Sequence, residues 1–287
     1  MPSIDPRSPE RLKRLFEETE AVLITAGNGF SRLEKFDPLT SPRWFRHHFR
    51  DLRARHKLHS IAHGIMFPYP ARTMEWAFMG RLIALLSSRQ PMSEPMKAVA
   101  LMAAQRPLFV ATTSADGSFR TAGIGDERLF EMAGNLHFMH CRWLCNDAVF
   151  PVEDAVRTML APGLTPTIAP EHIPRCPRCN APMTSTIARD LRFMERPDWA
   201  MGYYRLLSFL RSHSSKRLLI IELGVSPWNA WLKSIAIHAA DRNPLAQYLQ
   251  VNDQSSYLPP RLYDRTLQLE HGIVEALSSL LGIETAE

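Results

Sequence analysis

The sequence lacks the features that place a protein in a membrane or in an oxidising compartment. Its apolar runs are brief, and none approaches the ~18 residues that a membrane-spanning helix needs. The N-terminal stretch MPSIDPRSPERLKRLFEE has no apolar core of the kind that a secretory signal carries. Only four cysteines occur, all between Cys141 and Cys179. These absences predict a cytoplasmic protein with reduced thiols.

Blocks of like charge are also missing. The net charge is +5, but the basic residues are mostly arginines spread along the chain, with no run of five or six like charges. Basic tails that bind nucleic acid usually form such runs, so their absence disfavours a dedicated nucleic-acid-binding function.

The chain does contain short apolar runs that alternate with helical patterns. The runs lie at 21–26, 108–113, 217–223 and 247–252, and the helical patterns at 73–88, 94–105, 198–213 and 266–281. With 45% hydrophobic residues, the chain can bury a sizeable core. Buried strands alternating with helices predict an α/β fold, in which a parallel sheet carries helices on both faces.

Small or polar residues follow each of the four apolar runs. These strand ends are Gly27-Asn28-Gly29, 114–117, Gly224-Val225-Ser226 and Asn252-Asp253. Ligands of such sheets bind beyond the carboxyl ends of the strands. We therefore expect the four ends to converge on one crevice.

The cysteines form two closely spaced pairs. Cys141-x3-Cys145 and Cys176-x2-Cys179 are separated by 30 residues. Two such pairs offer four thiolates to one tetrahedral ion, which predicts a structural zinc site with every position filled. A redox role for the second pair and four unrelated free thiols are the alternatives.

Two regions interrupt the strand–helix alternation and predict a second lobe. Residues 32–72 are rich in aromatic, histidine and arginine side chains, and 136–197 contain the cysteines and many prolines. The predicted large domain comprises 1–45, 101–135 and 198–287. The predicted small helical and zinc-binding lobe comprises 46–100 and 136–197.

A glycine loop, TAGNGFS, follows the first apolar run. Glycines let a backbone approach a pyrophosphate closely, and amides at a helix start attract anions. The loop departs from G-x-G-x-x-G and has no P-loop lysine. A tight structural turn explains it equally well.

The ordered set of motifs resembles the sirtuins, a family of NAD-dependent deacylases and ADP-ribosyltransferases. The pattern is most similar to the macrodomain-linked microbial sirtuins, called class M. The matching segments are GNGFS at 27–31, HGIMFPYP at 63–70, CPRCNAPMT at 176–184, LLIIELGV at 218–225 and QYLQVN at 247–252. They span nearly the whole chain in order.

The resemblance implies a Rossmann-type large domain, a small zinc-and-helix lobe and NAD in the cleft between them. It implies that the first glycine loop lines the NAD phosphates and the nicotinamide end, and that the 224–226 loop holds the adenosine side. The implied NAD-binding residues are Gly27, Asn28, Gly29, Phe30, Ser31, Thr113, Gly224, Val225, Ser226 and Asn252.

The implied catalytic positions are Ser114, Asp116 and Ala133, and two of them depart from the family. Sirtuins carry asparagine where this chain has Ser114. Most carry histidine, and class M glutamine, where it has Ala133. Alanine neither accepts a proton nor donates a hydrogen bond, so base assistance worth roughly 10²–10⁴-fold is absent at that position. His137, four residues further along a strand, would lie about 13 Å away.

Two functions remain open at this point. The first is a sirtuin-like transferase that cleaves the nicotinamide–ribose bond of NAD. It would pass ADP-ribose to a protein side chain or an acyl-lysine, with acylated and lipoylated proteins among the acceptors. The second is a degenerate module that binds NAD or ADP-ribose as a sensor or scaffold. An alanine engineered at position 133 is a further explanation, although Ser114 favours natural divergence.

Overall fold

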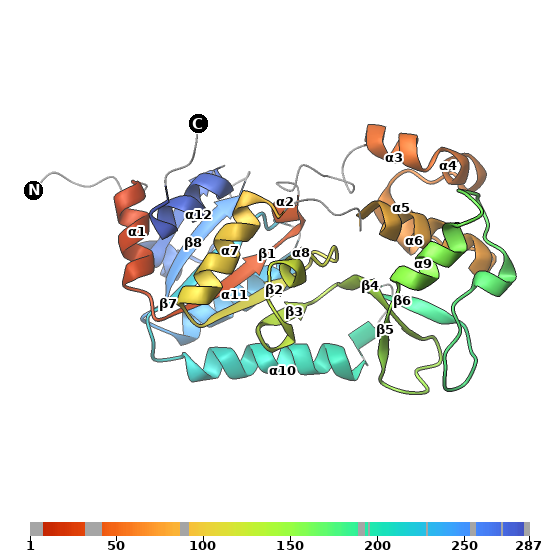
Figure 1. Cartoon of the computed structure of the whole chain (residues 1–287). Helices are drawn as coiled ribbons and strands as arrows, with labels where there is room; N and C mark the ends of the chain where they lie inside the picture. The colour runs from red at the N-terminus through yellow and green to blue at the C-terminus, as the bar shows by residue number, and fades with distance from the viewer. Residues whose placement is uncertain are drawn as a thin grey trace, which may run out of the picture.

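The described chain forms a large lobe and a small lobe (Figure 1). This computed structural model describes residues 8–31, 42–86, 92–188, 193–194, 196–227, 229–252, 257–270 and 272–283. The large lobe is built on a six-stranded sheet, and the small lobe combines helices with a three-stranded sheet.

The large sheet is parallel throughout its described strands, in the order β3-β2-β1-β7-β8-β9. The strands are β1 Ala21–Ala26, β2 Leu108–Thr112, β3 Leu129–Glu131, β7 Leu218–Leu223, β8 Gln247–Asn252 and β9 Thr266–Glu270. β1 lies in the centre, where Leu23 pairs with Phe109 on one side and Ile220 on the other. All six of its residues are buried, because helices cover both faces and leave no polar side to the strand.

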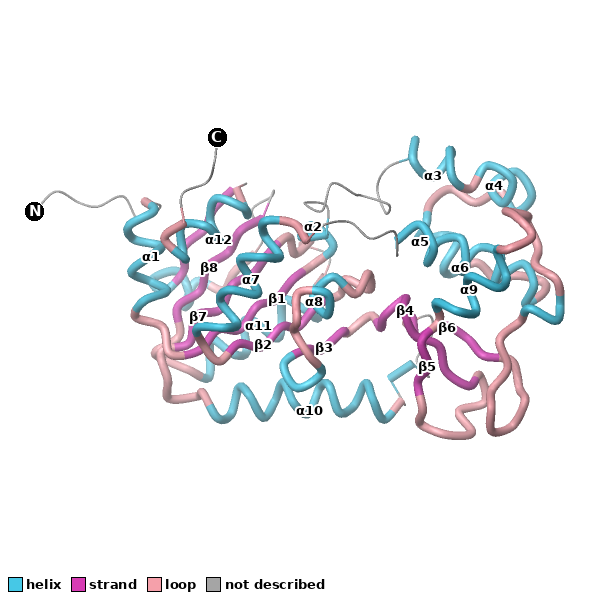
Figure 2. The backbone as a smooth tube through the Cα atoms, viewed as in Figure 1, coloured by secondary structure: helices cyan, strands magenta, loops and turns pink. Residues whose placement is uncertain are grey.

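Helices cover the two faces of this sheet (Figure 2). Through Leu12 and Met102, α1 and α7 share one apolar core with α12 and the sheet, and α10 and α11 pack on the opposite face. Their bounds are α1 Pro9–Glu17, α7 Glu94–Gln105, α10 Pro197–Ser212, α11 Ala230–Arg242 and α12 Ile273–Leu281. No helix in the described ranges is both long and apolar enough to cross a membrane.

The predicted fold class is confirmed, with differences in single elements. β1, β2, β7 and β8 occupy the four predicted apolar runs. The helix predicted over 266–281 is wrong at its start, because Thr266–Glu270 pairs with β8 as a strand. The helix begins only at Ile273, after Gly272 at φ +79°. The sequence reasoning also missed α11.

The small lobe has its own apolar core beside a small antiparallel sheet. The sheet has the order β5-β4-β6, and Trp76 and Phe78 of α6 lie in the core. The elements are α3 Pro42–His48, α4 Arg50–His56, α5 Ile61–Met66, α6 Arg72–Leu86, β4 Gly134–Cys141, β5 Val149–Pro151, α9 Glu153–Leu160 and β6 Met183–Ile187. Because α7 packs on the large sheet, we propose a lobe boundary between α6 and α7 in place of the expected one at residue 100.

Candidate cofactor cleft and metal centre

The loops after β1 and β7 pack directly against each other at the carboxyl edge of the sheet. The Gly29 amide donates to the Gly224 carbonyl at 3.0 Å. A Cβ atom on Gly27 would stand 2.4 Å from that carbonyl oxygen, and one on Gly29 would stand 2.7 Å from it. Gly224 itself has φ +57°, in the left-handed region that favours glycine. The glycines are therefore needed for this close contact between the two loops.

Asn252, at the end of β8, fixes the same loop from the other side. Its Oδ1 accepts a hydrogen bond from the Val225 amide at 2.8 Å, and its Nδ2 donates to Glu222 Oε1 at 2.7 Å. Three of the predicted strand ends thus meet in the structure. The neighbouring Asp253, which the sequence analysis placed with them, lies outside the described residues.

A buried carboxylate holds this part of the edge together. Glu222 on β7 is fully buried and accepts hydrogen bonds from Lys233 Nζ at 2.9 Å and Gln250 Nε2 at 2.8 Å. The Tyr248 hydroxyl donates to its other oxygen at 2.5 Å. Burial, together with the adjacent Glu222 charge, raises the pKa of Tyr248, which therefore stays a donor. Buried charges are tolerated when they are paired in this way.

Sequence reasoning missed this carboxylate, although the chain carried a signal for it. Glu222 is the one charged residue inside the apolar run LLIIEL. A charged side chain in a strand that is buried on both faces requires a partner, but the sequence alone does not identify which residue that partner is.

The loop after β2 joins the edge next to the glycine loop. The Thr113 amide donates to the Ala26 carbonyl at 3.2 Å, and the Ser114 amide donates to Thr112 Oγ1 at 2.9 Å. Asn229 Nδ2, at the start of α11, donates to Thr113 Oγ1 at 2.9 Å. Ser114 is buried. The predicted Thr113 and Ser114 positions therefore lie at the carboxyl edge of the sheet, and Thr113 is tied to the loop after β7 through Asn229.

Asp116 and His137 lie where this loop meets the small lobe. Asp116 Oδ1 accepts from the Ser118 amide at 3.0 Å, which supports the short helix α8 (Ser118–Thr121). His137 Nε2 lies 2.9 Å from the Asp116 carbonyl oxygen, and its Nδ1 lies 3.3 Å from Glu153 Oε1. The imidazole is thus held between the two lobes.

Ala133 links β3 to β4 at the same junction and is half-buried. Its carbonyl accepts from the Ala188 amide at 3.0 Å, and the Met132 amide donates to the Thr112 carbonyl at 2.8 Å. The Leu136 amide in turn donates to the Ala115 carbonyl at 2.9 Å. The segment that carries Ala133 therefore runs beside the Ser114 loop.

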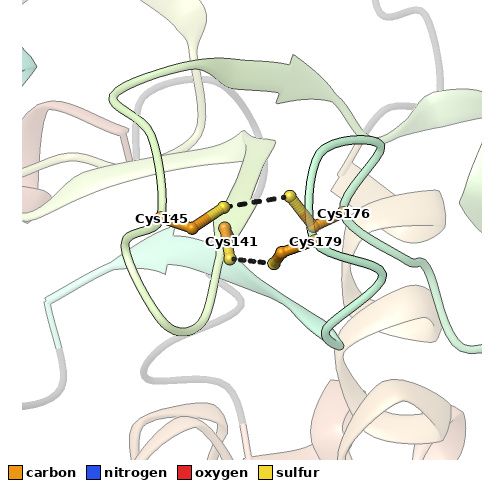
Figure 3. A group of neighbouring side chains, drawn as sticks. All are labelled: Cys141, Cys145, Cys176 and Cys179. Carbon is orange, nitrogen blue, oxygen red and sulfur yellow. Dashed lines mark hydrogen bonds between the residues drawn. The ribbon is translucent and has the colours of Figure 1, made fainter.

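The four cysteines gather at one end of the small sheet (Figure 3). Their Sγ atoms all lie within 4.8 Å of one another, with Cys141–Cys179 and Cys145–Cys176 each at 3.5 Å. A tight turn with one left-handed residue accompanies each pair: Leu144 at φ +49° lies within the first pair, and Asn180 at φ +58° directly follows the second. Four thiolates bound to tetrahedral zinc at ~2.3 Å stand roughly 3.8 Å apart, so the arrangement fits that ion.

The pKa values of the clustered cysteine thiols are also compatible with a bound cation. The Cys179 backbone amide donates to the Cys176 sulfur and lowers the pKa of Cys176 to about 6. Hydrogen bonding with Cys179, together with desolvation, raises the pKa of Cys145 to about 12. Four thiols in mutual contact cannot all ionise without a cation between them, and Zn²⁺ would supply that charge. The donor set is a closed one, suited to a structural ion.

Comparison with known proteins gives two relatives in sequence. No family model matches the chain. It is 24% identical over 277 residues to a protein ADP-ribosyltransferase of Staphylococcus aureus, covering 96% of this chain and 87% of the relative. It is 26% identical over 228 residues to a probable bifunctional ADP-ribose hydrolase/ADP-ribosyltransferase of Fusarium oxysporum. That match covers 72% of this chain and 35% of the relative.

Solved sirtuin structures match the chain over nearly its full length. A Sir2 homologue in complex with NAD superposes with a TM-score of 0.66 at 16% identity, covering 96% of this chain and 93% of that one. The chain has the sirtuin fold. Within the sirtuin fold, the large sheet and the cysteine-bearing lobe appear here in the arrangement that the resemblance implied.

The remaining predicted residues of this sirtuin fold differ in exposure. Phe30 is buried and stacks on Phe119 with ring centroids 5.4 Å apart, and Val225 is buried as well. Asn28 and Ser226 are exposed on the two glycine-containing loops. Ser31 ends the short helix α2 (Asn28–Ser31), and its side chain lies outside the described part of the structure.

Proposed function

We propose that the protein is an NAD-dependent transferase of the sirtuin type, which passes ADP-ribose from NAD to an acceptor protein. The contact between the Gly27–Gly29 and Gly224 loops at the carboxyl edge of the sheet carries this proposal. The name of the Staphylococcus aureus relative supports the transferred group and the acceptor class. Membership of class M, and acylated or lipoylated lysine as acceptors, belong to the same proposal.

The loops at this edge suit a dinucleotide. A pyrophosphate needs backbone that approaches closely, and glycine-rich loops after parallel strands provide it. Asn28 and Ser226 offer exposed polar side chains on the two loops. We assign the phosphates and nicotinamide end to the 27–31 loop with Thr113, and the adenosine side to 224–226 with Asn252.

The proposed reaction breaks the bond between nicotinamide and ribose. The bonding electron pair leaves with nicotinamide, and a nucleophilic atom of the acceptor forms the new bond to the anomeric carbon and releases its proton to solvent. Ala133 cannot take that proton. The rate would therefore depend on orientation and on electrostatic stabilisation of the cationic transition state at the Ser114–Asp116 loop.

A second candidate function is binding without turnover. The substitutions at Ser114 and Ala133 favour it, because they remove side-chain chemistry while the glycine loops stay intact. In this case the protein would act as a sensor or scaffold for NAD or ADP-ribose.

Two measurements on the same protein separate these functions. Nicotinamide release and mass spectrometry of acceptors incubated with NAD test transfer, with an unmodified protein and an acyl-lysine peptide as separate arms. Calorimetry with NAD and with ADP-ribose tests binding. Release above the protein-free blank with modified acceptor supports the transferase, and binding without release supports the sensor. If the protein neither binds NAD or ADP-ribose nor releases nicotinamide, both functions are excluded.

A further inference from the structure

A pocket lies at the junction of the two lobes. It has a volume of about 240 Å³ and lies between β3, the first turns of α10 and the three strands of the small sheet. The described residues that line it include none of the residues assigned above to NAD. It is therefore a separate site.

The pocket contains a buried cation with an unused donor. The Arg196 side chain is 4% exposed, and its Nε and Nη2 donate to the Asp198 carboxylate at 3.0 and 2.5 Å. Its Nη1 has no hydrogen-bond partner within the described part of the chain. A buried donor without an acceptor is unfavourable, and a guanidinium is best satisfied by an anion. The position at the N-terminus of the 16-residue helix α10 favours negative charge further.

Aromatic rings line the pocket beside the guanidinium groups. The Arg196 guanidinium lies over the Phe193 ring at 5.7 Å, and that of Arg120 lies over Phe138 at 5.3 Å. Phe130 and Trp199 form an edge-to-face pair with centroids 5.2 Å apart. Such walls accept a flat apolar group, and the guanidinium groups accept a negative one.

The acidic residues of the lining do not cancel this preference. The side chain of Asp198 is 45% exposed and that of Asp126 is 65% exposed, so water screens both charges. Glu131 is the buried one, and it accepts hydrogen bonds from Arg120 Nε at 2.8 Å and from Asn135 Nδ2 at 2.6 Å, so its charge is paired with Arg120. The acidic side chains therefore pair with Arg120 and with Nε and Nη2 of Arg196, and they leave Arg196 Nη1 as a donor for a ligand.

We propose that this pocket binds a small planar aromatic carboxylate, with its carboxylate on Arg196 Nη1 and its ring between the aromatic walls. A ligand there touches α10 of the large lobe and β4 and β6 of the small lobe at once. Its binding would stabilise this arrangement of the lobes and raise the thermal midpoint of the protein.

Benzoate is the probe for this pocket, titrated by calorimetry into the full chain without NAD. We expect saturable binding of one benzoate per chain. Arg196→Gln should weaken it at least about tenfold, since it removes the charge and the donor. Asp198→Asn should keep or tighten it, because the competing carboxylate is gone. Arg211→Gln, at the exposed end of the same helix, is the control and should leave it unchanged.

Benzamide has the same ring without the charge and should bind at least about tenfold more weakly than benzoate. Equal binding of benzoate by the parent and Arg196→Gln, or no saturable binding by the parent, would overturn the proposal. Competitive displacement by NAD would also overturn it, by placing benzoate in the other cleft. If Arg196→Gln does not fold by circular dichroism, loss of benzoate binding in Asp198→Asn or equal affinity for benzamide decides against the site.

Discussion

The carboxyl edge of the large sheet has two halves that differ in how their side chains are used. The glycine half comprises 27–31, 224–226 and Asn252, and its loops are tied by backbone contacts and the buried Glu222 network. The serine half comprises 113–116 and Ala133, and it carries small side chains where the sirtuin resemblance implies asparagine and histidine or glutamine. Both halves have an ordered backbone, but only the glycine half retains the expected residue types.

This difference separates binding from chemistry. Backbone amides and glycines can bind a dinucleotide whatever the catalytic side chains are, because the binding comes from close approach of the backbone to the phosphates and from the backbone dipoles. Proton transfer, in contrast, requires a titratable group at one place. The comparison therefore predicts that NAD affinity survives in this chain and that the turnover rate is the quantity that has changed.

The largest expected effect comes from refilling the serine half. The double substitution Ser114→Asn with Ala133→His should raise nicotinamide release by roughly 10²–10⁴-fold, because a base returns beside the ribose. Steady-state kinetics with NAD would measure it. Ala133→Leu adds volume without proton chemistry and should give no gain. An unchanged rate in the double variant would show that the two positions do not lie at the reacting bond.

Breaking the ion pair of the glycine half should cost stability. Lys233→Met leaves the buried Glu222 charge with hydrogen-bond donors but no counter-ion. The free energy of unfolding should fall by about 3 kcal/mol, near the lower end for such pairs, because the other donors remain. Urea denaturation measures the change. Lys216→Met, on a lysine whose side chain is 54% exposed, should change it little. An equal loss in both variants would contradict a special role for the buried pair.

A smaller effect is expected where the Glu222 network reaches the 224–226 loop through Asn252. Asn252→Ala leaves the Val225 amide without its 2.8 Å acceptor, so the 224–226 loop is less well fixed. The dissociation constant for NAD should rise about tenfold, which corresponds to the cost of one buried unsatisfied donor. Calorimetry would measure it, with Gln268→Ala on the exposed side of β9 as the control. Unaltered affinity would separate Asn252 from NAD binding.

The smallest expected effect concerns the link between the halves. Asn229→Ala removes the hydrogen bond to Thr113 and the side-chain cap of α11, and should lower the free energy of unfolding by about 1 kcal/mol. Asn229→Asp should recover most of it, because a carboxylate caps the helix and accepts from the Thr113 hydroxyl. The urea midpoints of the three proteins give the comparison, and an aspartate variant no better than alanine would contradict it.

Local patterns in the sequence predicted the features that rest on local physics. The apolar runs at β1, β2, β7 and β8 predicted buried parallel strands because no polar side could face water. The two cysteine spacings predicted a cluster because each pair fits one tight turn. The cluster is confirmed by the structure, although the spacings alone could not bring the two pairs together.

Other features depend on contacts between distant parts of the chain. The β9 strand at 266–270 forms by pairing with β8, and the alternation of leucine with polar residues in TLQLE is a strand signal that the helix prediction overlooked. Glu222 finds its donors 11 to 30 residues away, on α11 and β8. The position of α7 on the large sheet was likewise decided by packing against α12.

The sequence by itself determined the parallel sheet, the order of its glycine and polar strand ends, and the four thiols available to one ion. These follow from which residues can be buried and which backbones can turn. Only the tertiary structure decided that Glu222 supports the 224–226 loop through Asn252 and that Arg196 lines a pocket between the lobes. The Glu222 network and the Arg196 pocket are both formed by side chains that are far apart in the sequence and come close to each other only when the chain folds.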